Sequence, residues 1–447
     1  MINTRDRDCT GTVCNPELFQ FPAVKKRQVT AAFSGGDVTS DGGILLLRQA
    51  DRQVGLTKAL AGVLPDPRNP ERITHPLLTF IRQRVYGLCL GYEDLNDHDH
   101  LREDLAWQTA AEREEVLASS PTLCRWENRA DRKVAWLVQE IMVNQFIASF
   151  KQAPAELVLD FDSTDDRVHG KQEGRFFHGY YGNYCFLPLY VFCGEQLLVS
   201  YLRPSNQDNA RHAWVILKLL VKRLRQAWPQ VKIVMRADSG FCRWRMLRWG
   251  DDQGVGYVIG RARNDRLLAL AQPLLTQAQT QHEQTQEKQR LFGEVQYAAA
   301  SWDKQRRVIA KAEHTDKGSN PRFVVTNLGT DAQKLYDEVY CARGEMENRI
   351  KEQQLGLFSD RTSCHDWWAN QFRLLLSSCA YVLLETMRRL GLAGTDLARA
   401  QVGTIRLKLL KIGAVVLRNT RRVRLLLASS YPYQSIFAQV AKAFSTG

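Results

Sequence analysis

The chain has 447 residues, of which 44% are hydrophobic and 24% charged, the ordinary balance of a soluble globular protein with two to three domains. Its 61 Lys and Arg outnumber its 48 Asp and Glu, and the net charge of +13 favours a polyanionic partner, nucleic acid first, over simple solubility. The ten cysteines include no C-x2-C pair, which excludes zinc-finger and thiol-redox motifs and favours free thiols in a reducing cytoplasm. No segment has the pattern of a signal peptide or a membrane span, so we expect a cytoplasmic protein without a membrane partner.

The first third of the chain has a helical pattern. Residues 1–30 mix charged, polar and proline residues without periodicity, so we expect a mobile start. Helical periodicity begins after Ser40 and returns at residues 75–91, 99–118 and 129–150. These segments predict an α-helical N-terminal domain over residues 1–150.

From Glu156 the pattern changes to short apolar runs typical of strands. Three strands, a helix, a strand, a helix and a strand are expected at residues 156–162, 184–193, 195–202, 209–228, 231–237, 242–252 and 255–260. Residues 151–261 should therefore form the first part of an α/β core with a mixed five-stranded sheet. Two of the strands lead into an aspartate, Asp162 or Asp238, and ligand chemistry tends to lie at such strand ends. Asp160 shares a strand face with Asp162 and stays open as an alternative to it.

Between its last strand and its last helix, such a core needs a shorter segment than residues 262–330. The runs 291–298, 306–313 and 322–328 are strand-like, whereas the Gln/Thr/Glu-rich residues 276–290 predict a solvated connection. We therefore expect residues 262–330 to form a β-rich insertion domain.

A helical pattern without proline runs from Asp331 to Leu357. Residues three, four or seven apart share a helix face, so one stripe contains Tyr340, Arg343, Glu347 and Lys351. A solvated ladder of ion pairs is one interpretation of this stripe. The other is that Glu347 joins the two aspartates over one sheet edge. Three such carboxylates repel one another and need a cation, and their oxygen-only ligands favour Mg²⁺ or Mn²⁺.

The end of the chain is predicted to be helical and basic. A helix over residues 366–390 would complete the second part of the core, residues 331–395, and a basic helical region would follow over residues 396–447. Residues 401–447 contain eight Lys or Arg and no Asp or Glu, which favours phosphate contact over a solvated face. The candidate DNA contacts in this part of the chain are Arg361, Arg421 and Arg422.

Three blocks resemble, in order, the catalytic blocks of bacterial insertion-sequence transposases of the DDE superfamily: Asp162-Ser-Thr, Asp238-Ser-Gly-Phe and Tyr340-x2-Arg343-x3-Glu347. The likeness is to the branch with a Tyr-Arg-Glu signature on the last catalytic helix, and it covers roughly residues 30–430. It implies an RNase H-like core, interrupted by the insertion, in which Asp162, Asp238 and Glu347 are catalytic and hold two Mg²⁺ ions, with Mn²⁺ as a possible substitute. Relatives often have a lysine where this chain has Gln354, and Lys351 could take its place.

The resemblance also implies an activity. Such a transposase binds the terminal inverted repeats of its element, cleaves the donor DNA and joins the 3′ ends to target DNA by two-metal-ion phosphoryl transfer. The partner would be double-stranded DNA in the bacterial nucleoid, bound by the N-terminal domain and by Tyr340, Arg343 and Lys351, with a homodimer in the synaptic complex. Two alternatives stay open: a metal-dependent, structure-specific nuclease without strand transfer, and a DNA-binding protein whose catalysis has lapsed.

Overall fold

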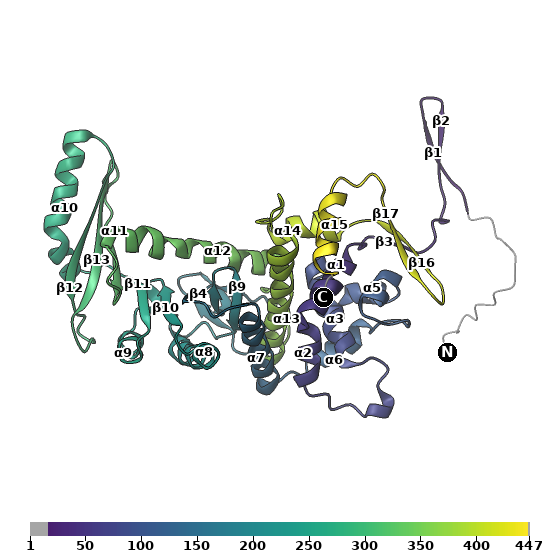
Figure 1. Cartoon of the computed structure of the whole chain (residues 1–447), viewed down its shortest axis with the longest axis horizontal. Helices are drawn as coiled ribbons and strands as arrows, with labels where there is room; N and C mark the ends of the chain where they lie inside the picture. Colours follow the sequence, from purple (N-terminus) through teal and green to yellow (C-terminus); the bar gives the residue numbers. More distant parts are fainter. Residues whose placement is uncertain (1–16, 446–447) are drawn as a thin grey trace.

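A nine-stranded mixed sheet runs through the computed structural model, which describes residues 17–445 (Figure 1). Along one path its strands are β12 (Gln289–Tyr297), β13 (Arg306–Thr315), β15 (Arg322–Thr326), β11 (Gly256–Arg261), β10 (Lys232–Ala237), β4 (Glu156–Ser163), β8 (Leu189–Cys193) and β9 (Gln196–Tyr201), and β14 (Gly318–Ser319) pairs with β13. Strand β10 is parallel to β4 and to β11, and the other pairings are antiparallel. The five strands from β9 to β11 match those that the sequence predicts for the core, except that the predicted strand 184–193 is divided between β8 and β7 (Asn183–Phe186), which lies in another sheet.

Along the central strands, successive side chains point to opposite faces of the sheet, and different helices cover the two faces. Leu159 and Phe161 of β4 lie on one face, with Met235 of β10, in a core closed by helices α8 (Ala213–Ala227) and α9 (Trp244–Gln253). The opposite face bears Val234 and is covered by the helical run that begins at α11 (Ala332–Lys334) and includes α12 (Gly344–Lys351). Figure 1 shows this run lying along the sheet, above β10, β4 and β9. The polar residues of β4 and β10 that share the second face therefore lie under a helix.

The insertion continues the core sheet. Strand β15 pairs antiparallel with β11, so the strands of residues 262–330 share hydrogen bonds with the core. The predicted solvated connection is wrong, because helix α10 (Asp265–Thr285) covers most of it. Its buried Leu267, Ala271, Ala278 and His282 form a helical stripe among Gln and Thr, and this stripe explains the helix.

The N-terminal helices share one hydrophobic core with the C-terminal part of the chain. They are α1 (Ile44–Val54), α2 (Leu56–Val63), α3 (Leu77–Leu90), α4 (His98–Leu101), α5 (Leu105–Ala110), α6 (Ser120–Glu127) and α7 (Arg132–Ala148). The almost wholly buried helix α13 (Trp367–Thr386) packs against α3, α7 and β9 and so joins this core to the edge of the sheet. Within residues 17–445, no helix combines the length and apolarity that crossing a membrane requires.

The prediction of a wholly helical C-terminal region is wrong for residues 414–427. Strands β16 (Ala414–Arg418) and β17 (Val423–Leu427) form an antiparallel ribbon between the short helices α14 (Val402–Ile405) and α15 (Gln434–Ala443). Consecutive branched side chains on either side of a short polar turn favour strands, and this local pattern explains the ribbon. Strand β16 also pairs with β3 (Val38–Thr39), so the two ends of the chain share a small sheet.

Two smaller β structures complete the fold. Strands β5 (Asp166–Arg167), β7 (Asn183–Phe186) and β6 (Phe176–His178) form a three-stranded sheet in the segment that follows β4. Strands β1 (Phe19–Val24) and β2 (Arg27–Ala31) form a ribbon where the sequence predicts a mobile start, although residues 1–16 of that segment lie outside the described part of the chain.

Candidate active site

Asp162 and Asp238 stand side by side at the ends of two parallel strands. In the register of β4 and β10, Ala237 is paired with Phe161, so the next residue on each strand is an aspartate. Neighbouring strands lie about 4.8 Å apart, and the two carboxylates therefore share one sheet edge. The Ser163 amide donates to Asp162 Oδ1 at 2.9 Å, and the Gly240 amide donates to Asp238 Oδ1 at 2.9 Å. Both side chains are thus oriented by the backbone immediately after them.

The third carboxylate lies on the helical run over that edge. The run is not a regular α-helix, because π-turns at Leu335–Tyr340 and Glu352–Gly356 flank α12. Such π-turns occur frequently at functional sites. Arg343 Nη2 donates to Glu347 Oε1 at 2.8 Å, which confirms that these two residues share a helix face.

Arg343 joins the helix to the sheet. Its Nη1 donates to Asp162 Oδ2 at 2.7 Å, so one guanidinium bridges Asp162 and Glu347, and the Asp238 charge also acts on it. Burial raises the pKa of Asp162 from 3.8 to about 6; the Arg343 charge opposes this rise and the Asp238 charge adds to it. Burial thus disfavours the ionised form of Asp162, and Arg343 is the cation that offsets this effect.

Asp160 has a different role from Asp162. It is 3% exposed and accepts two hydrogen bonds from Arg236 on the adjacent strand, one of them from Nη2 at 2.6 Å. Arg236 Nη1 donates to the Val339 carbonyl, in the π-turn just before Tyr340, at 2.6 Å. This buried ion pair thus ties both aspartate-bearing strands to the helical run. Because Asp160 is more deeply buried than Asp162 and its carboxylate is paired with the buried Arg236, Asp160 is the weaker of the two alternatives for a metal ligand.

Gly260 on β11 lets the parts of the site approach one another. A Cβ atom added there would lie 2.6 Å from Tyr340 Oη, 3.0 Å from Ser239 N and 3.3 Å from the carbonyl carbon of Asp238. A glycine is therefore required where the tyrosine meets the turn after Asp238. The Tyr340 ring also packs on Tyr336, with centroids 5.5 Å apart, so it is partly buried.

The remaining predicted DNA contacts lie at three separate places. Lys351 is exposed at the end of α12, and Gln354, one helical turn later, donates to the Asp165 carbonyl at 3.0 Å. Arg361 forms an ion pair with Glu93 at 3.0 Å and is 60% exposed. Arg421 and Arg422 are exposed in the turn between β16 and β17, far along the molecule from α12 (Figure 1).

Sequence reasoning missed Arg236 and Gly260. A signal for Arg236 was present, because Asp160 and Arg236 each stand two residues before a site aspartate and would pair across in-register strands. Gly260 gave no such signal, since its requirement comes from a helix and a loop distant in the chain. Only the assembled sheet reveals it.

The donor chemistry of the three carboxylates fits a divalent cation. Asp162, Asp238 and Glu347 offer oxygen atoms alone, the ligands that Mg²⁺ and Mn²⁺ prefer. Within residues 17–445, no three His, Cys, Asp or Glu side chains stand close enough together to hold an ion, and Arg343 joins two of the three carboxylates, Asp162 and Glu347. Its guanidinium supplies the positive charge that a metal would bring.

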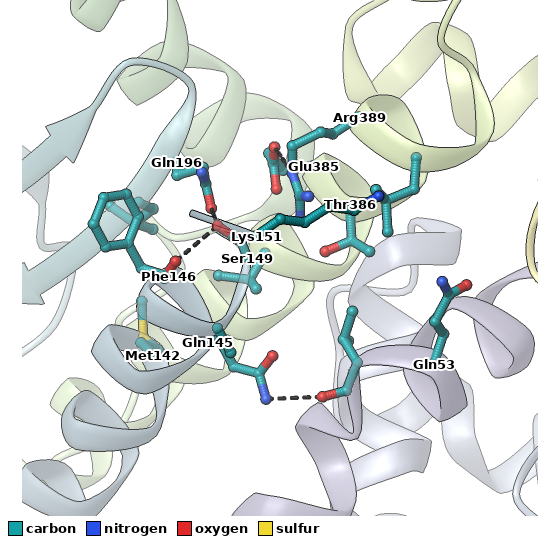
Figure 2. Close-up of a pocket in the computed structure, with 15 residues that line it drawn as sticks. Gln53, Met142, Gln145, Phe146, Ser149, Lys151, Gln196, Glu385, Thr386 and Arg389 are labelled. Atoms are coloured by element: carbon teal, nitrogen blue, oxygen red, sulfur yellow. Dashed lines mark hydrogen bonds and ion pairs between the residues drawn. The ribbon is translucent and has the colours of Figure 1, made fainter. Parts of the chain in front are cut away.

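Two cavities lie away from these carboxylates. One, of about 300 Å³, lies between α1, α7 and α13. Among its lining side chains, Figure 2 shows the Glu385–Arg389 ion pair and the hydrogen bond from Ser149 to Gln196. The other, of about 870 Å³, lies between α7, α8 and β9 and is lined by the exposed Trp136 and Val215. None of the three carboxylates lines either cavity.

The sequence matches a known protein family. A family model described as "Transposase DDE domain group 1" matches residues 21–446. Among solved structures, the chain is similar to a piggyBac transposase synaptic complex with hairpin DNA, determined by cryo-EM, with 10% identity, a TM-score of 0.41, and coverage of 83% of this chain and 80% of that one. No curated protein matches the sequence.

Proposed function

The chain belongs to the DDE transposase family described as Transposase DDE domain group 1, and from that premise we propose that it binds the ends of its own mobile element, cuts the donor DNA there and joins the freed 3′ ends to target DNA. The observation that carries the proposal is the placement of Asp162 and Asp238 in register on parallel strands, with Arg343 joining Asp162 to Glu347. Transposases of this superfamily generally use divalent metal ions.

In the proposed site, Asp162, Asp238 and Glu347 would hold two Mg²⁺ ions. When bound, such ions activate water or a 3′-hydroxyl and stabilise the leaving oxygen. The backbone amides after both aspartates keep their carboxylates oriented, and the Arg236–Asp160 pair keeps the helical run in place above them. Arg343 balances the carboxylate charge before DNA arrives and can then turn toward a phosphate, to which a guanidinium binds in a bidentate manner.

The DNA surface in this proposal extends beyond the carboxylates. Lys351 is exposed beside the site, and Tyr340 is held at its edge by β11. Arg421 and Arg422 would contact phosphates farther along the duplex, in a complex that pairs two element ends on two copies of the chain. Arg361 would have to leave Glu93 to take part.

A test compares two glutamates of the same helix. With duplexes copied from the element ends and Mg²⁺, Glu347→Gln should lower the cleavage rate by about a hundredfold or more, the scale of losing one group that stabilises charge in a transition state, while DNA affinity is retained. Glu345→Gln is the matched control, because Glu345 is 75% exposed and is paired with Arg349. Mapping of products on sequencing gels provides the readout. Equal cleavage by the two variants would refute the site, and cleavage without joined products would favour the nuclease alternative.

A further inference from the structure

The β1–β2 ribbon lacks a partner in the described part of the chain. Every residue of β1 is exposed, and in β2 only Val29 is partly covered. Within residues 17–445 the two strands pair only with each other. Figure 1 shows the ribbon projecting from the end of the molecule opposite the insertion. An isolated two-stranded ribbon is marginally stable in water, so we expect this one to be held by a partner.

Positive charge is concentrated at the tip of the ribbon. Lys25 and Lys26 form the turn, Arg27 is the first residue of β2 directly after it, and residues 18–36 contain no Asp or Glu. None of these three cations forms an ion pair within residues 17–445. An unneutralised cluster of this kind favours a polyanion.

The two faces of the ribbon differ in chemistry. In its register Phe19 is paired with Ala31 and Phe21 with Val29, which places the apolar side chains on one face. The opposite face bears Gln20 and Thr30, which are paired with each other, and Gln28, and all three are exposed. The DNA major groove admits a two-stranded ribbon, and amide and hydroxyl side chains can hydrogen-bond to base edges there.

A second basic ribbon lies at the same end of the molecule. The β16–β17 turn carries the exposed Arg421 and Arg422, and β16 pairs with β3, which follows β2 after a short connection. The two ribbons are therefore attached at neighbouring points of one small sheet (Figure 1).

We infer that the β1–β2 ribbon enters a DNA groove, with Lys25, Lys26 and Arg27 at phosphates and Gln20, Gln28 and Thr30 at base edges. This inference rests on the proposed function and specifies it: a β-ribbon, in addition to the N-terminal helices, reads the element ends. A second copy of the chain is the other conceivable partner for the apolar face. The charge disfavours it, because a tip of three cations would approach a protein of net charge +13.

The test measures DNA binding over a range of salt concentrations, with duplexes copied from the element ends and a random-sequence duplex of equal length. Replacing Lys25, Lys26 and Arg27 together by Gln should flatten the slope of log K against log salt by about 2 to 3, since each phosphate contact contributes about 0.9. The matched control replaces three exposed lysines on helices, Lys58, Lys218 and Lys222, by Gln and should keep the slope. Because the ribbon is exposed, both variants should keep the wild-type melting temperature.

A second variant tests base reading. Replacing Gln20, Gln28 and Thr30 together by Ala should reduce the preference for end duplexes over random sequence by about tenfold or more, and should leave the salt slope unchanged. Wild-type slope and preference in the respective variants would overturn the inference while cleavage by the wild type upholds the proposed function. A wild-type dimer that becomes a monomer in the tip variant, measured by sedimentation without DNA, would overturn it in favour of an interface between copies. If the wild type neither binds nor cuts the end duplexes, the proposed function itself fails.

Discussion

Arg343 is the residue on which the charge balance of the site depends. It donates to Asp162 and to Glu347, and its side chain is only 17% exposed. A partly buried carboxylate without a counter-charge is costly, so the cation stabilises the fold as well as the site. In the proposed mechanism, metal ions would replace Arg343 as the counter-charge of these carboxylates, and Arg343 would then contact DNA.

This exchange predicts a metal-dependent stability difference. Arg343→Met should lower the free energy of unfolding without metal by about 1 to 3 kcal/mol, the scale of hydrogen bonds to charged groups. Added Mn²⁺ should then raise the melting temperature of the variant more than that of the wild type, because the ion restores the missing positive charge. Lys351→Met, which removes an exposed cation from the same helix, is the control. Identical Mn²⁺-induced shifts in all three proteins would argue against a shared cation site.

At the scale of elements, the buried Asp160–Arg236 pair determines where the helical run that carries Glu347 lies. It joins β4 to β10, and through Val339 it joins both strands to the turn that precedes Tyr340. A regular helix could slide along an apolar sheet face, whereas a charged donor aimed at one carbonyl defines a single register. Through the hydrogen bond to Val339, the pair therefore fixes the position of Glu347 farther along the same helical run.

Two variants separate stability from placement. Arg236→Met should cost about 3 to 5 kcal/mol in urea unfolding, because Asp160 is left buried and unpaired. The double variant Asp160→Leu/Arg236→Met should regain most of that stability, since apolar replacements of buried pairs are often neutral. It should still cleave DNA more slowly than the wild type at unchanged DNA affinity, because the hydrogen bond to Val339 is absent. Full recovery of the cleavage rate would show that packing alone places the helix.

At the scale of the whole molecule, the insertion and the core form one hydrogen-bonded sheet. An ion pair at the far end can therefore affect the stability of the whole sheet. Glu313 on β13 accepts from Lys311 at 2.8 Å and from Asn320 at 3.1 Å, and it pairs with Lys288 at 3.1 Å. The hydrogen bond from Lys311, first among these, lowers the pKa of Glu313 from 4.5 to about 2.

The direction of this shift gives a pH dependence. Because the pKa is lower in the folded chain, the ionised Glu313 contributes stability above about pH 4.5, and the contribution is lost as the pH falls toward 2. Glu313→Gln should therefore unfold at lower urea than the wild type at pH 7, and the difference should shrink as the pH falls below 4.5. Glu338→Gln, at a 66% exposed residue, is the control and should show a smaller difference. A difference that persists unchanged at the lowest pH would contradict the ionic origin.

The sequence allowed the core strands and the helical run to be predicted, because their apolar patterns are local. The helical prediction for residues 414–427 is wrong because branched side chains on either side of a polar turn favour strands. Helix α10 was hidden by the Gln and Thr residues around its buried stripe. The roles of Asp162, Asp238 and Glu347 stay predictions from the resemblance, and the structure adds their common neighbour, Arg343. Arg236 and Gly260 depend on contacts between distant segments, which no local pattern encodes.

The pairing of β3 with β16 has a consequence for synthesis on the ribosome. Thr39 is paired with Ala414, and the N-terminal helices bury their apolar faces against α13 and the residues that follow it. A chain that is still emerging can fold the core sheet, since β4, β8, β9, β10 and β11 are made within one stretch, but α13 and the later residues of the N-terminal core are not yet made. Contacts of such long sequence separation form late. We propose that the two ribbons hold DNA, and they would thus be positioned only after nearly all of the chain has been translated. A product truncated before residue 414 would lack the β16–β17 ribbon and the pairing of β3 with β16.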